Sequence, residues 1–128
     1  MYKKSVFCFL LLLQSAFSFA QCGVNEIEIK IEIATDNFGD ETYWKLTDLT
    51  GTIISQGGQG GTYGNFSLYA ESICVAADGC FFFEIFDTYG DGIFAPYGYK
   101  LFANGKLVAS GSDDIGRYAR VTAYCPDK

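Results

Sequence analysis

Residues 27–41 read IEIKIEIATDNFGDE, and residues 81–92 read FFFEIFDTYGDG. Each stretch is a strand-like run followed by an acidic loop of the form Asp-x-x-Gly-Asp. The first run alternates apolar and charged residues, which predicts a β-strand with one buried and one solvated face. The second run is largely apolar on both faces, which predicts a strand near the centre of its sheet.

The two stretches belong to two copies of one pattern, which occupy residues 22–74 and 80–125. Each copy begins and ends with a cysteine, and the acidic loop occurs at the same place in both. Two copies are too few for a solenoid, which needs several stacked repeats. The repeat therefore predicts one domain with a pseudo-two-fold axis, whose halves bury each other's apolar faces.

Turn signals, such as the Asn-Gly pair at 104–105, separate eight predicted strands. No segment after residue 20 shows a helical period over a useful length. These patterns predict an all-β fold, an antiparallel two-sheet β-sandwich of the jelly-roll type. The expected strands cover residues 24–33, 43–46, 52–56, 66–74, 81–86, 98–103, 107–110 and 118–125.

The first twenty residues have the pattern of a secretory signal peptide. Lys3 and Lys4 precede an apolar run, and a small-residue cleavage pattern ends at Ala20. We therefore expect residues 1–20 to be removed and residues 21–128 to form a single domain. That domain would be extracellular or periplasmic, and we expect no membrane insertion of the mature chain.

Charge and composition argue against several classes of function. Without its first twenty residues the chain has seven Lys and Arg against fifteen Asp and Glu, a formal net charge of −8. Such a surface repels phosphate backbones, so we expect no nucleic acid partner. The chain has no histidine, which excludes Ser-His-Asp and Cys-His catalysis. Glycoside hydrolysis by a pair of carboxylates is the catalytic mechanism that the composition still allows. Such short loops offer no evident substrate cleft, so we expect that the protein is not an enzyme.

Four cysteines follow the signal peptide: Cys22, Cys74, Cys80 and Cys125. An even number in a small exported domain predicts two disulfides. The repeat is compatible with all three connectivities, and we favour Cys22–Cys125, which ties the termini, and Cys74–Cys80, which closes a short link. A zinc site made of all four cysteines is the weaker alternative, because the spacings are not Cys-x-x-Cys and no histidine is present.

The acidic loops are the best candidates for function. Glycine in each loop lets the backbone curl and turn the two aspartates inward. Converging carboxylates repel one another unless a cation lies between them, and calcium prefers carboxylate and carbonyl oxygens. We therefore expect calcium at one or both loops, which as symmetry mates could share one ion. In the alternative, these residues cap turns through their own side chains and bind nothing. The expected ligands are Asp36, Asp40 and Glu41 in the first loop, and Asp87 and Asp91 in the second.

Three segments resemble a β-sandwich module that recurs in secreted proteins of Bacteroidota-like bacteria. They are TDNFGDETYWKL at 35–46, FEIFDTYGDGI at 83–93 and YGYKLFANGKLVASG at 97–111. The resemblance extends over residues 36–125. It implies an exported module of the kind found beside peptidases, other secreted enzymes and C-terminal sorting segments.

The chain departs from that module at two places. Typical members have cysteines after the GDGI loop, where this chain has Phe94 and Ala95. They often have proline in the first loop where this chain has Gly39. The acidic pair Asp87 and Asp91 is retained, so the departures concern an extra disulfide rather than the candidate metal ligands.

The second acidic loop carries extra aromatic residues. From Asp87 to Leu101 the chain is four residues longer than over the matching stretch of the first copy. The insertion contains Phe94 and Tyr97, which we expect to be exposed and to contact a ligand, whereas we expect Trp44 and Tyr99 in the strands to be buried. The sequence thus predicts a secreted, non-catalytic, calcium-dependent binding or accessory module whose partner is an extracellular glycan or protein. The alternative is a structural or adhesive β-sandwich without metal.

Overall fold

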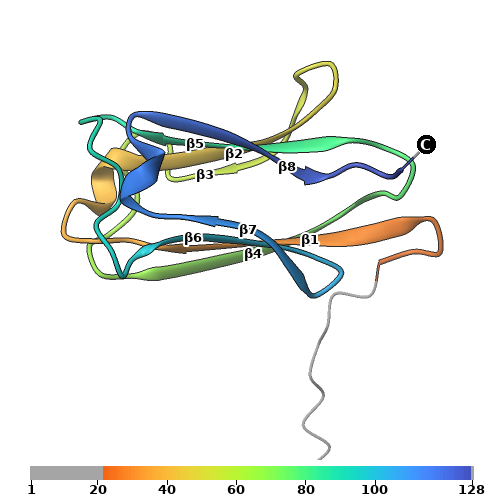
Figure 1. The fold of residues 1–128 in the computed structure, drawn as a ribbon, viewed down its shortest axis with the longest axis horizontal. Coiled ribbons are helices and arrows are strands. Elements are labelled where there is room, and N and C mark those ends of the chain that lie inside the picture. The colour runs from red at the N-terminus through yellow and green to blue at the C-terminus, as the bar shows by residue number, and fades with distance from the viewer. Residues whose placement is uncertain (1–21, 128) are drawn as a thin grey trace, which may run out of the picture.

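A computed structural model describes residues 22–127, so the predicted signal peptide lies outside the described residues. The fold is a sandwich of two four-stranded antiparallel sheets (Figure 1), which confirms the prediction of an all-β sandwich. In this part of the chain no helix has the length and apolar character needed to cross a membrane.

The first sheet has the strand order β4-β1-β6-β7 and the second has the order β3-β2-β5-β8. Strands of the first sheet are β1 (Glu26–Ala34), β4 (Leu68–Ala76), β6 (Gly98–Ala103) and β7 (Lys106–Gly111). Strands of the second are β2 (Thr42–Asp48), β3 (Ile53–Gly57), β5 (Phe81–Asp87) and β8 (Tyr118–Tyr124). Two short 3₁₀ turns, η1 (Gly39–Glu41) and η2 (Asp113–Ile115), follow the ends of strands.

The strand order shows how the repeat is used. The first copy contributes β1 and β4 to one sheet and β2 and β3 to the other, and the second copy does the converse. Replacing each strand of one copy by its counterpart in the other turns one sheet order into the other. Each sheet therefore contains two strands from each copy, and the two copies pack against each other across the core.

The core lies between the sheets and follows the alternation seen in the sequence. Every second residue of β1, from Ile27 to Ile33, is buried, while the charged residues between them face solvent. Full burial of one such side chain contributes roughly 1.5–3 kcal/mol. The predicted burial of Trp44 and Tyr99 is confirmed, with exposed fractions of 1% and 4%.

The predicted disulfide pairing is wrong. The structure pairs Cys22 with Cys74 and Cys80 with Cys125, not Cys22 with Cys125 and Cys74 with Cys80. β4 and β5 belong to different sheets, and packed sheets lie about 10 Å apart, so the short link after Cys74 crosses the sandwich instead of closing a loop. Each disulfide joins the start of a copy to its end within one sheet, and with all four cysteines oxidised the alternative zinc site is excluded.

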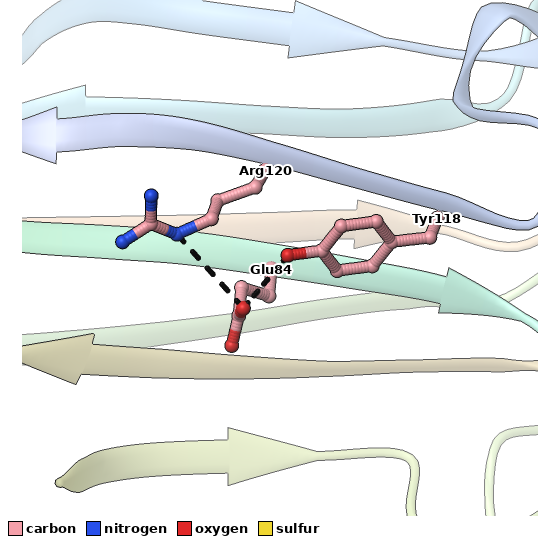
Figure 2. A network of polar contacts seen from close by, with 3 residues as sticks. All are labelled: Glu84, Tyr118 and Arg120. Atoms are coloured by element: carbon pink, nitrogen blue, oxygen red, sulfur yellow. Dashed lines mark hydrogen bonds and ion pairs between the residues drawn. The ribbon is translucent and has the colours of Figure 1, made fainter. Parts of the chain in front are cut away.

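The outer face of the second sheet carries a polar network on neighbouring strands (Figure 2). Tyr118 donates its hydroxyl hydrogen to Glu84 at 2.8 Å, and the Nε of Arg120 lies 3.9 Å from the same carboxylate oxygen. Partial burial and the neighbouring carboxylate raise the pKa of Tyr118. Tyr118 remains 46% exposed, so this face is a solvated surface with ordered side chains.

The acidic loops lie together at one end of the sandwich, on the left in Figure 1. That end carries the loops after β1, β3 and β5 and the turn before β8. The opposite end carries the β2–β3 turn and both disulfides. The fold thus separates the covalent links from the candidate site.

Candidate functional site

Three carboxylates converge where the two acidic loops meet. The side-chain oxygens of Glu41, Asp87 and Asp91 all lie within 4.8 Å of one another. The pairing of β2 with β5 places Thr42 opposite Asp87, so Glu41, one residue earlier, reaches the second loop. The backbone N–H of Thr88 donates to the carbonyl of Glu41 at 3.0 Å. The prediction that the loops lie side by side therefore holds for Glu41 and the second loop.

Asp87 is the buried member of this group, with an exposed fraction of 2%. Its Oδ2 accepts the backbone N–H groups of Gly90, Asp91 and Gly92 at 3.2, 2.8 and 2.6 Å. Its Oδ1 accepts the N–H of Tyr89 at 3.3 Å. Asp87 therefore organises the whole second loop, as the turn interpretation of the sequence expected, in addition to facing the other two carboxylates.

Gly92 explains why the second loop lacks a counterpart of Glu41. Its φ is +77°, a conformation that side chains disfavour. A Cβ at this position would lie 2.7 Å from the backbone of Asp113. The second copy therefore gives up a carboxylate here so that its loop can close, and the ligand set is asymmetric.

Asp36 and Asp40 are not part of the convergent group. Asp36 is buried, and its two oxygens accept the N–H groups of Phe38 and Phe94, both at 2.8 Å. Its role in the structure is to tie the first loop to the second. Asp40 is exposed to solvent. Of the five predicted metal ligands, the structure brings together Glu41, Asp87 and Asp91.

The pKa values of two of the converging carboxyl groups, Glu41 and Asp91, are raised. Loss of solvent contact, followed by the charges of Asp87 and Asp91, raises the pKa of Glu41 to about 7 from 4.5. Loss of solvent contact and the proximity of Asp87 also raise the pKa of Asp91. A bound cation would remove this repulsion.

The donor set fits a hard cation. All three side chains offer oxygen, which calcium and magnesium prefer over softer metals. Arg117 supports the loop from outside by donating to the carbonyls of Thr88 and Tyr89 at 2.9 and 3.3 Å. The remaining positions of a calcium ion would fall to loop carbonyls and water, since calcium takes about six to eight oxygens.

The predicted ligand-binding residues lie beside the acidic group. Phe94 is 45% exposed, and its ring meets that of Phe38 edge-on at 6.3 Å. Tyr97 is only half-buried rather than fully exposed, because part of its ring packs against the core. It lies 5.6 Å from the ring of Phe66. Both predicted residues are thus accessible, Tyr97 less than expected.

Sequence reasoning missed several residues near Tyr97. Phe66 stands at the start of the expected strand 66–74, but it precedes β4, is 64% exposed and has a φ of +49°. A groove of about 560 Å³ lies beside Tyr97, and its lining includes Leu68, Lys100 and Asp114. These residues belong to no motif. Only the outward positions of Leu68 on β4 and Lys100 on β6, and the position of Asp114 in η2, could have indicated them.

No protein-family model, no curated protein and no solved structure matches this chain. The interpretation of the loop end therefore depends on its own geometry.

Proposed function

We propose that this protein is a secreted, non-catalytic binding or accessory module whose loop end binds calcium through Glu41, Asp87 and Asp91. The observation that carries the proposal is the convergence of these carboxylate oxygens within 4.8 Å. The two disulfides are consistent with an oxidising extracellular or periplasmic location. Calcium is abundant outside cells, so a site of modest affinity would be filled there.

Calcium at this position would act as a cross-link between the loops. Glu41 comes from the first loop, whereas Asp87 and Asp91 come from the second. An ion held by both would fix the loop that carries Phe94 and Tyr97. We propose that this loop contacts an extracellular glycan or protein, which makes ligand binding depend on calcium.

One observation favours a second candidate, a structural or adhesive domain without metal. Asp87 already accepts four backbone N–H groups, so these four donors of the second loop are satisfied without an ion. In that case the raised pKa of Glu41 would let a proton take the place of the cation near neutral pH.

Thermal unfolding with and without calcium separates the two candidates. A ligand that binds only the native state stabilises it by RT ln(1 + [L]/Kd), about 2.7 kcal/mol at one hundred times Kd. We expect calcium to raise the Tm of the wild-type protein and of Asp40→Asn, whose carboxylate lies outside the group. An equal Tm in EGTA and in millimolar calcium would support the metal-free domain.

The variants Glu41→Gln and Asp91→Asn sharpen this test. Each removes one negative charge from the group, so in EGTA each should be at least as stable as the wild type. Each should also lose most of the stabilisation by calcium. Variants that respond to calcium like the wild type would place the ion elsewhere.

A further inference from the structure

The outer face of the first sheet is hollowed beneath the loop that follows the acidic group. The groove has a volume of about 560 Å³. Its lining includes small residues on the central strands, Ala34 on β1 and Gly98 on β6, which pair with each other. Because these positions lack bulk, the loop containing Pro96 and Tyr97 forms a wall above a depressed floor.

The groove runs across the sheet rather than along a strand. Its lining includes residues of all four strands, from Leu68 on β4 to Ser110 on β7. At the spacing of about 4.8 Å between neighbouring strands, this is a span of roughly 14 Å. A polymer can therefore lie across the face, with both ends continuing into solvent.

The lining is apolar on one side and polar on the other. Leu68 is 69% exposed, and Tyr97 and Pro96 continue the apolar wall. The neighbouring register row places Glu32 opposite Lys100, and Lys100 opposite Ser110. Exposed apolar side chains beside a few ordered polar groups are typical of recognition sites.

The direction of the groove disfavours a peptide. The backbone groups of β1 and β6 are paired within the sheet, so a chain that crosses them at a right angle finds no ladder of donors and acceptors. Its own N–H and C=O groups would be desolvated against Leu68 and Ala34, at a cost for each unpaired group. A sugar chain differs, because its pyranose rings have apolar faces and carry hydroxyl groups, which both donate and accept, around the edge.

The charges in the groove favour a neutral ligand. The groove lining contains one cation, Lys100, and two carboxylates, Glu32 and Asp114. Glu32 is also paired with Lys30 at 2.8 Å. No excess of positive charge is left to attract an acidic polymer, which the formal net charge of −8 on residues 21–128 would also repel. The ligand that best matches this groove lining is an uncharged polymer with many hydroxyl groups.

We propose that this groove binds a neutral polysaccharide that crosses the outer face of the first sheet beneath residues 95–97. Sugar rings stack on Tyr97 and on the exposed ring of Phe66 beside it, and their hydroxyls bond to Lys100, Glu32 and Asp114. This inference rests on the proposed function as a binding module, and it names the ligand class and the surface.

The test is binding of the purified protein to the hexaoses of cellulose, xylan, mannan and β-1,3-glucan, measured by calorimetry, with alginate as the acidic comparison. We expect binding to at least one neutral hexaose and none to alginate. Phe66→Ala, Lys100→Ala and Tyr97→Ala should each weaken it about tenfold or more, a loss of about 1.4 kcal/mol. Tyr118→Ala is the matched control, an exposed aromatic on the other sheet, and should bind like the wild type.

Phe66 and Lys100 are exposed, so their variants keep the test valid if Tyr97→Ala fails to fold. Failure of every neutral hexaose to bind, binding of alginate alone, or unchanged affinity in the Phe66 and Lys100 variants would overturn the inference. A separate calcium titration of the same protein distinguishes this failure from failure of the proposed metal site. Hexaose binding that depends on the groove in a protein that binds no calcium would sustain the inference and refute only the metal.

Discussion

Replacing Asp87 by alanine should destabilise the protein by about 3 kcal/mol. Four backbone N–H groups lose their acceptor, and that of Gly92 is buried. A buried donor left unpaired costs about 1–3 kcal/mol, and a hydrogen bond to a charged group contributes about 1.5–3 kcal/mol net. The other three N–H groups can form hydrogen bonds to water instead. The estimate therefore adds the cost of one unpaired buried N–H group to part of the free energy contributed by the other three hydrogen bonds. Whole domains have only about 5–15 kcal/mol of stability.

The assay is urea unfolding in EGTA, followed by the fluorescence of Trp44, which is the single tryptophan and is 1% exposed. A loss of 3 kcal/mol corresponds to a fall in Tm of roughly 10–20 °C for a domain of this size. Asp91→Ala is the control, because it removes the same charge from the same loop and should change stability by less than about 1 kcal/mol. An Asp87→Ala variant as stable as this control would refute the organising role of Asp87.

Two further predictions concern pH and the disulfides. Because the folded-state pKa of Glu41 is raised to about 7 from 4.5, the folded state binds more protons between these values, and stability in EGTA should fall as pH rises from about 4.5 to 7. Urea midpoints across this range should show the slope in the wild type and a smaller one in Glu41→Gln; equal slopes would contradict the assignment. Removing the second bridge by Cys80→Ser with Cys125→Ser opens a loop with a sequence separation of 45, which the chain-entropy model converts to about 4 kcal/mol of lost stability. Non-reducing peptide mapping of the wild type should recover that bridge, and a peptide joining Cys74 to Cys80 would contradict the structure.

The fold could be predicted from the sequence because the patterns that indicate it are local and occur twice. The alternation of apolar and charged residues around Ile29 and Ile31 predicted a strand with one buried face. The duplicated pattern predicted two equivalent halves of one domain. The disulfide pairing could not be predicted in this way, because the spacing between Cys74 and Cys80 does not reveal that the strands on either side belong to different sheets. Strand pairing, not chain distance, decides which cysteines meet.

The candidate site could be predicted only in part, because strand pairing also decides which carboxylates meet. Asp36 and Asp87 occupy equivalent places in the sequence, and both are buried as acceptors of backbone N–H groups. Of the two, only Asp87 belongs to the group whose carboxylate oxygens lie within 4.8 Å of one another, because the pairing of Thr42 with Asp87 brings Glu41 to it. This asymmetry comes from the packing of the loops, which no short motif encodes. The exposure of Phe66 likewise depends on a backbone conformation that its sequence neighbours do not reveal.

Calorimetric titration of calcium into the EGTA-treated protein above pH 7 tests the central claim most directly. The account predicts saturable binding of one ion per chain, because within residues 22–127 one group of three carboxylates converges at the loop end. It also predicts that Glu41→Gln abolishes or strongly weakens this binding, whereas Asp40→Asn, one residue away and exposed, retains it. No saturable binding at millimolar calcium, or equal affinity in the wild type and Glu41→Gln, would contradict the assignment of Glu41, Asp87 and Asp91 as a calcium site.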